Sequence, residues 1–196
     1  MEPLFHYDFN SPYAYLAAAR IDTVLGPGVR WQPIAFAFLL RAQGREPWSF
    51  HAPTRSEGIA ECERRARERG LPPMTWPAGW PRDSYAILPL RVALVADEHG
   101  LLREYSMAAY ARNFVSGTGL LGEAPLEVAE ELGLAREVVE AGLAAAKDRL
   151  TAATTAAIAA GVVGVPTVLV GDEAFWGDDR LEDAAAATAR AGGRAG

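Results

Sequence analysis

The hydroxyl of Ser11 lies where it could take part in chemistry. It belongs to the segment DFNSPYAY, Asp8 to Tyr15, which joins an expected buried strand, Leu4 to Phe9, to an expected amphipathic helix, Tyr13 to Leu25. Free backbone N–H groups and the positive end of the helix dipole meet at such a junction, so a hydroxyl there is well placed to help hold an anion. A serine followed by Pro12 is also typical of a plain helix N-cap.

Two segments far along the chain favour a binding site over a plain cap. The first is the step Val165-Pro166-Thr167, which precedes an expected short strand, Thr167 to Val170. A Gly-Asp turn and a second expected strand, Ala174 to Trp176, follow. Such a step before a strand is also typical of a simple loop start.

The second segment is FWGDDRL, which ends the second of these strands. A final helix is expected to begin near Asp179, with Asp178 or Asp179 as its cap. The alanine-rich tail from Ala184 is expected to be disordered. The C-terminal part of the chain therefore has the order ββα.

The N-terminal part has the order βαβ. After the helix that ends at Leu25, a Gly-Pro-Gly break precedes an alternating strand, Val29 to Ile34, expected to lie parallel to the first strand. Between the two parts the pattern is helical, and Pro89 indicates a kink or a late start in one of these helices. Ala37–Ala42 is expected to form a short apolar turn. The expected helices are Ser56–Arg69, Asp83–His99, Leu102–Phe114, Leu126–Leu132 and Val138–Ala160.

This order predicts an α/β fold, thioredoxin-like, with a large helical insertion between the βαβ and ββα halves. The thioredoxin-like domain is expected to comprise residues 1–36 and 158–196, and the helical insertion domain residues 37–157.

Composition excludes several function classes. The chain of 196 residues has a net charge of −6, which argues against a surface for nucleic acid. Its one cysteine, Cys62, excludes a disulfide, a dithiol redox pair and a cysteine zinc site, and three scattered histidines give no ligand spacing, so no metal is expected. No secretory signal and no apolar run long enough to cross a membrane is found, so we expect a cytoplasmic protein.

Three stretches together resemble the 2-hydroxychromene-2-carboxylate isomerases and the kappa-class glutathione transferases, in the DsbA-like group of the thioredoxin superfamily. They are DFNSPYAYLA (8–17), WPAGWPRDS (76–84) and GVVGVPTVLVGDEAFWGDDRL (161–181). The resemblance covers nearly the whole chain. It implies a bound cofactor, glutathione or another low-molecular-weight thiol.

The resemblance also implies which residues hold that thiol. Ser11 replaces the nucleophilic cysteine of a thiol oxidoreductase and acts on the thiol sulfur, whose pKa it would lower together with the helix N-terminus. Pro166 is expected to be cis, so that the backbone of Val165 can pair with the cysteinyl part of the ligand. The γ-glutamyl end would be held by Trp176, Gly177, Asp178 and Asp179.

The substrate side departs from the family pattern. Arg41 stands in place of a usual lysine, and Arg45 falls where an asparagine is usual. Arginine binds a carboxylate in a bidentate geometry that lysine lacks, so the change is not neutral. Tyr85 approximately matches a substrate-contacting aromatic residue. The small aromatic substrate implied by the family is therefore expected near Arg41, Arg45 and Tyr85.

The leading hypothesis is a glutathione-dependent isomerase of the 2-hydroxychromene-2-carboxylate type. One alternative is a kappa-like glutathione transferase, and another is a non-catalytic DsbA-like protein that binds a thiol or a peptide. A homodimer is common in these families. Cys62 is interpreted as structural, whereas Trp48, Trp76 and Trp80 are expected either in the core or in the wall of an aromatic pocket.

Overall fold

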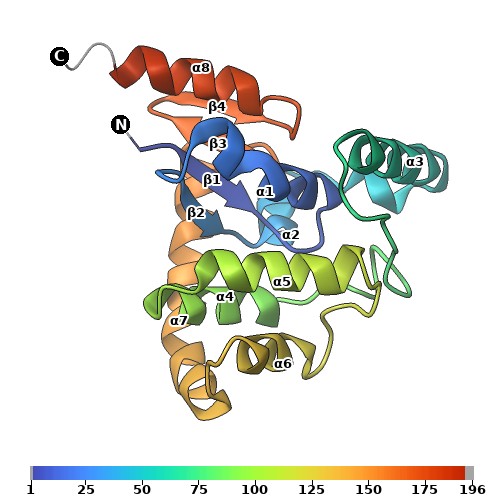
Figure 1. Ribbon diagram of the computed structural model, residues 1–196, viewed down its shortest axis with the longest axis vertical. Coiled ribbons are helices and arrows are strands. Elements are labelled where there is room, and N and C mark those ends of the chain that lie inside the picture. Colours follow the sequence, from blue (N-terminus) through green and yellow to red (C-terminus); the bar gives the residue numbers. More distant parts are fainter. Residues whose placement is uncertain (1, 193–196) are drawn as a thin grey trace.

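A four-stranded mixed sheet organises the computed structural model, which describes residues 2–192 (Figure 1). The strand order is β2-β1-β3-β4. β1 (Leu4–Tyr7) runs parallel to β2 (Arg30–Pro33) and antiparallel to β3 (Thr167–Val170), which pairs antiparallel with β4 (Glu173–Trp176). The predicted βαβ and ββα halves therefore share one sheet, and the prediction of a thioredoxin-like α/β fold is confirmed.

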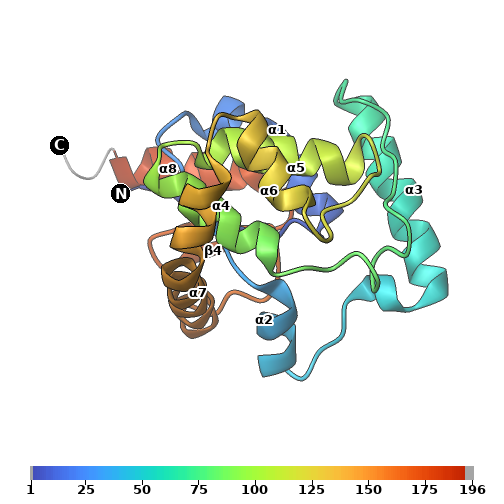
Figure 2. The same ribbon diagram turned by 90° about the horizontal axis from the view of Figure 1, so that it is seen from below.

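Helices cover both faces of this sheet. α1 (Pro12–Leu25) and α8 (Leu181–Gly192) pack together over one face. α2 (Phe36–Ala42) and α7 (Arg136–Ala159) lie on the opposite side, as the view in Figure 2 shows. A small apolar core fills the space on the α2–α7 side, with Ile34, Leu39 and Val165 among its buried members.

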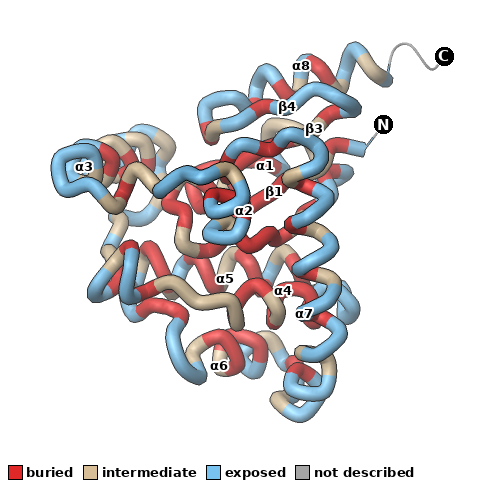
Figure 3. Tube along the Cα trace, turned by 180° about the vertical axis from the view of Figure 1, so that it is seen from behind, coloured by how far each residue is buried: buried red, intermediate tan, exposed pale blue. Residues whose placement is uncertain are grey.

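The remaining helices come from the segment between the two halves. They are the 3-10 helix η1 (Trp48–Phe50), α3 (Ala52–Glu68), α4 (Leu88–Glu98), α5 (Leu102–Phe114) and α6 (Ala124–Glu131). α3 projects to one side of the sheet in Figures 1 and 2, and most of its surface is exposed in Figure 3. α4 packs against α5, α6 and α7, and α6 also contacts α5 and α7, whereas η1 packs on α3.

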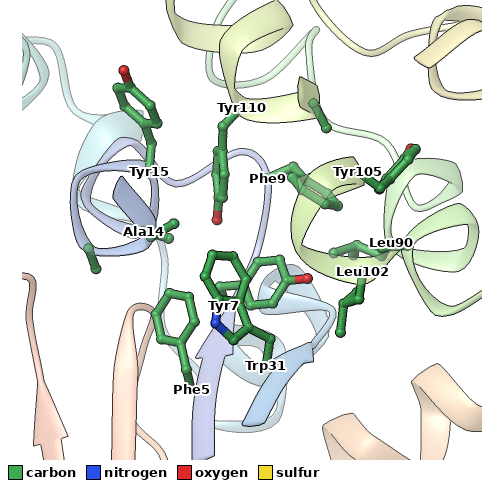
Figure 4. Close-up of a cluster of buried hydrophobic side chains, with 14 of the residues drawn as sticks. Phe5, Tyr7, Phe9, Ala14, Tyr15, Trp31, Leu90, Leu102, Tyr105 and Tyr110 are labelled. Carbon is green, nitrogen blue, oxygen red and sulfur yellow. The ribbon is translucent and has the colours of Figure 1, made fainter. Parts of the chain in front are cut away.

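One continuous aromatic core joins the sheet to the helical segment (Figure 4). The rings of Phe5 and Tyr7 on β1 stack with centroids 5.2 Å apart, and Phe9 meets Tyr105 and Tyr110 of α5. Such ring pairs add directional contacts to the burial of their large apolar area. This core therefore contains residues from both predicted domains. The division of the chain into a thioredoxin-like domain and a helical insertion domain stays a prediction.

Two differences from the sequence-based helices have clear causes. α4 begins at Leu88 rather than Asp83, since Pro89 fits the first turn of a helix and not its interior, which is the late start that this proline predicts. The prediction of disorder from Ala184 is wrong up to Gly192, because Leu181, Ala184 and Ala187 bury the inner face of α8. Residues 193–196, the rest of the predicted disordered tail, lie outside the described residues.

No helix among residues 2–192 combines the length and the apolar character needed to cross a membrane.

A buried hydroxyl pair offers a test of the junction between β1 and α5. The Tyr7 and Ser106 hydroxyls are fully buried and lie 2.6 Å apart. In Ser106→Ala the Tyr7 hydroxyl loses this partner in the dry core, so we expect the free energy of unfolding to fall by about 1–3 kcal/mol. Tyr7→Phe should cost less, because Ser106 can turn to a carbonyl of its own helix.

The measurement is urea unfolding of both single variants and of the double variant. The double variant should be more stable than Ser106→Ala alone, since it removes the orphaned hydroxyl. Strictly additive losses would contradict the proposed coupling.

Candidate active site

Ser11 caps α1 and also reaches the loop before β3. Its Oγ accepts the Ala14 backbone N–H at 3.2 Å and lies 3.4 Å from the Val165 carbonyl oxygen, to which it donates. The predicted N-cap is therefore confirmed. Capping uses only a lone pair of the hydroxyl, and the second bond is long, so the Ser11 proton is available to another acceptor.

The loop before β3 has the form expected from its sequence. The Val165–Pro166 peptide bond is cis. Within residues 2–192 the Val165 N–H donates no hydrogen bond, while the Pro166 carbonyl accepts the Gly177 N–H at 3.0 Å. The Val165 N–H and the Ser11 hydroxyl are therefore both available to a ligand at the start of α1.

A cavity of about 460 Å³, here called the first cavity, opens beside this junction. All seven residues predicted to hold the thiol line it: Ser11, Val165, Pro166, Trp176, Gly177, Asp178 and Asp179. Tyr13, Trp48 and Trp80 form an aromatic wall, with the Trp48 ring 5.7 Å from Tyr13 and 5.8 Å from Trp80. The third tryptophan, Trp76, instead packs on Phe114 and donates its N–H to Glu63.

The two neighbouring aspartates of this cavity differ sharply. Asp178 is 1% exposed, and its carboxylate is ion-paired with Arg65 at 2.6 Å and with Arg69. Asp179 is 57% exposed and lies 3.5 Å from Arg65. Neither carboxylate accepts a backbone N–H among the described residues, so the prediction that one of them caps α8 is wrong.

This difference decides which aspartate can hold a ligand ammonium. Both oxygens of Asp178 are engaged by arginines, since packing of α3 brings Arg65 and Arg69 onto it. Asp178 therefore anchors α3 to the turn after β4, and only Asp179 keeps an exposed carboxylate in the first cavity. Sequence reasoning missed Arg65, which lines the same cavity, because charged residues on α3 resemble an ordinary solvated face.

A second cavity of about 580 Å³ adjoins the first. The three residues predicted on the substrate side, Arg41, Arg45 and Tyr85, all line it. The two cavities share a wall, and Arg45 contributes to both. The other shared residues are Asn10, Phe36, Leu40, Glu46, Pro47 and Ser49.

Beneath the shared wall lies the buried carboxylate of Asp8, which sequence reasoning did not single out. It accepts the Asn10 N–H at 2.9 Å, the Phe36 N–H at 3.0 Å and the Tyr85 hydroxyl at 3.2 Å. Burial raises the pKa of Asp8 to about 6, and these three donors oppose the rise. An acidic residue directly after a buried strand is the signal that could have revealed it.

Asn10 locks the turn to the loop before α4. Its side chain donates to the Pro81 carbonyl at 2.9 Å and accepts the Ser84 hydroxyl at 3.0 Å, while its own carbonyl accepts the Trp80 ring N–H at 3.2 Å. The aromatic wall is thereby held to the Ser11 turn.

Cys62 takes no part in either cavity. It is buried on α3 beside Tyr13, and burial raises the pKa of its thiol to about 12. A thiol of this kind is not ionised at neutral pH, so Cys62 is not a nucleophile.

Comparison with known proteins shows the family. The chain matches the model of the DsbA-like thioredoxin domain over residues 4–189. It is 32% identical over 190 residues to a 2-hydroxychromene-2-carboxylate isomerase of Pseudomonas putida, covering 90% of this chain and 89% of the relative. A solved 2-hydroxychromene-2-carboxylate isomerase superposes with a TM-score of 0.81 at 27% identity, covering 97% of this chain and 95% of the other.

A probable DsbA oxidoreductase of Streptomyces coelicolor shares the fold. Its TM-score is 0.73 at 22% identity, over 98% of this chain and 90% of the other.

The aspartate pair yields a stability prediction. Asp178→Asn leaves two partly buried guanidiniums without their carboxylate, so we expect the free energy of unfolding to fall by about 2–4 kcal/mol. Asp179→Asn is the matched control, and its exposed position predicts a change within about 0.5 kcal/mol. Urea unfolding of both variants measures the two values. Equal losses would contradict the anchoring role of Asp178.

Asp8 yields a pH prediction. Its pKa is higher in the folded chain than the ordinary 3.8, so the folded state binds the proton more tightly than the unfolded state. The contribution of Asp8 to stability is therefore most favourable below pH 4 and declines as the pH rises to about 6. Relative to Asp8→Asn, the free energy of unfolding of the unmodified chain should fall by about 2 kcal/mol across this window.

Unfolding curves for both proteins between pH 4 and pH 7 test this difference. The amide of Asp8→Asn alters the hydrogen bonds and therefore changes the free energy of unfolding by the same amount at every pH. Only the difference in the slope of this free energy against pH reports the titration of Asp8. Asp172→Asn, in the exposed turn between β3 and β4, serves as the control. Parallel curves for the chain and Asp8→Asn would contradict the raised pKa.

Proposed function

The chain belongs to the DsbA-like thioredoxin family, in the group of the 2-hydroxychromene-2-carboxylate isomerases, and we propose that it is a thiol-dependent isomerase of an aromatic acid. The observation that carries the proposal is the pair of adjoining cavities at the Ser11 turn. One offers a hydroxyl and a backbone donor, and the other offers arginines over an apolar floor.

The residues of the first cavity fit glutathione or a similar thiol. The Val165 N–H is free of internal partners in the described chain, and the Val165 carbonyl accepts only the long bond from Ser11, so both suit the backbone of a short peptide. The exposed carboxylate of Asp179 suits an ammonium group. Arg65 and Arg45 add positive charge for carboxylates of the ligand.

When bound, the thiol would supply a sulfur nucleophile for reversible addition to a conjugated carbon of the substrate. Ser11 would donate its proton to the sulfur as a hydrogen bond, and the N-terminus of α1 would favour the negative charge there. These two effects make a thiolate available at neutral pH without a cysteine from the chain.

The second cavity would bind and orient the substrate. Phe36, Leu40 and Phe50 contact an apolar ring, and the guanidiniums of Arg41 and Arg45 hold its carboxylate. Tyr85 is fixed by Asp8 at the wall of this cavity. The arginines also stabilise negative charge that develops on a substrate oxygen during isomerisation.

Disulfide exchange does not fit these residues. The chain has one cysteine, which is buried outside both cavities, so no dithiol can form.

Ser11→Ala tests the proposal. Millimolar glutathione should raise the melting temperature of the unmodified chain, because a ligand that binds only the folded state stabilises it. In Ser11→Ala the pKa of the bound thiol should rise by about 1–2 units, from loss of a hydrogen bond to a charged group. Thiolate absorbance in the ultraviolet, followed against pH, measures this shift.

Ser11→Thr is the matched control, since it keeps both the cap and the hydroxyl. A residue that only caps α1 would, on removal, lower the melting temperature and leave the thiol pKa unchanged. That result would remove Ser11 from the mechanism. Absence of any stabilisation by glutathione or other low-molecular-weight thiols would overturn the proposed function.

A further inference from the structure

The arginines of the second cavity stand out because they have no carboxylate partner. Within residues 2–192, ten arginines form ion pairs with one or more acidic side chains. Seven do not, and three of these seven line this one cavity: Arg41, Arg45 and Arg82. Gathering three like charges opposite a single acidic side chain, Glu46, is unfavourable, so the cavity is suited to an anion.

The three guanidiniums are not equivalent. Arg45 donates to the Val163 carbonyl at 2.6 Å, lies 5.7 Å from the Trp176 ring and is shared with the first cavity. Arg41, in the last turn of α2, and Arg82, in the loop before α4, line only the second cavity. The two that belong wholly to this cavity therefore come from different segments.

Arg82 is held in place by its contact with an aromatic ring. Its guanidinium carbon lies 3.7 Å from the centroid of Phe50, which is itself part of the lining. A cation stacked on a ring keeps its in-plane N–H groups free for a carboxylate. The stacked pair presents an apolar surface and a positive charge side by side.

The charge of the lining points to more than one negative group. The only acidic side chain that lines the cavity among the described residues is Glu46, so three arginines leave an excess of two positive charges. A single carboxylate neutralises one of them. Phe36, Leu40 and Phe50 add apolar side chains to the lining, which suit a ring.

We propose that the second cavity takes a dianion, a ring-containing molecule with two carboxylates or other acidic groups, one held by Arg41 and the other by Arg82. The inference rests on the proposed function for the role of this cavity as the substrate site. It adds to that function the class of substrate, an aromatic acid with two negative charges rather than one.

Benzoate and terephthalate test the inference, since they share a ring and differ by one carboxylate. Their affinities are measured by titration calorimetry at constant ionic strength, without any thiol. Terephthalate should bind the unmodified chain about tenfold more tightly, the effect of one charge-assisted contact. In Arg41→Gln and in Arg82→Gln this preference should fall to about threefold or less.

Arg67→Gln is the matched control. Arg67 is exposed on α3, has no ion pair and lines neither cavity, so its loss changes net charge alone. It should keep the full preference. Equal affinities for the two acids, undetectable binding of both, a preference that survives both substitutions, or an equal fall in Arg67→Gln would each overturn the inference.

The thiol measurements separate this inference from the proposed function. If glutathione stabilises the chain but terephthalate shows no preference, the substrate class is wrong and the thiol-dependent activity stands. If the preference is present and no thiol binds, the isomerase proposal fails and the dianion site remains.

Discussion

The hydrogen bonds accepted by the buried carboxylate of Asp8 hold together the segments that carry the candidate site. This carboxylate accepts three hydrogen bonds, from the Ser11 turn, the first residue of α2 and Tyr85. Asn10 and Phe36 line both cavities, and Tyr85 lines the second. The three donors favour the ionised carboxylate, whereas burial favours the neutral acid and raises the pKa to about 6. The chain therefore keeps a charge where burial opposes it. The unfavourable burial of this charge is typical of functional sites, where buried ionisable groups hold the geometry.

The Ser11 hydroxyl shows how one group serves two purposes. Its lone pair satisfies the first turn of α1, and its proton stays available because the bond to the Val165 carbonyl is long. A cysteine at this position would react, whereas a hydroxyl only polarises. The one cysteine of the chain, Cys62, is buried on α3 and lines neither cavity.

Much of the fold could be predicted because it depends on local patterns. The strand-helix junction at Ser11 and the late start of α4 at Pro89 each follow from neighbouring residues, whereas the cis bond at Pro166 is implied by the resemblance to a known family. The errors have a different origin. The tail from Ala184 was expected to be disordered because its composition is simple, but its alanines bury one face against α1. The capping role predicted for Asp178 is wrong, because packing brings to it two arginines more than a hundred residues earlier, which nothing near it in sequence indicates. Its role in ligand binding stays a prediction.

The sequence by itself determined the order of strands and helices along the chain and the hydroxyl turn, because strand alternation and helix caps act over a few residues. The set of residues expected around the first cavity came from the resemblance to a known family. Only the tertiary structure decided how charges are distributed. Packing of α3 neutralises Asp178 and leaves Asp179 exposed. Folding brings Arg41 and Arg82, from α2 and a later loop, to one cavity in which Glu46 is the only acidic lining residue among residues 2–192. Electrostatic partners are set by distance in space and by burial, and neither is encoded in spacing along the chain.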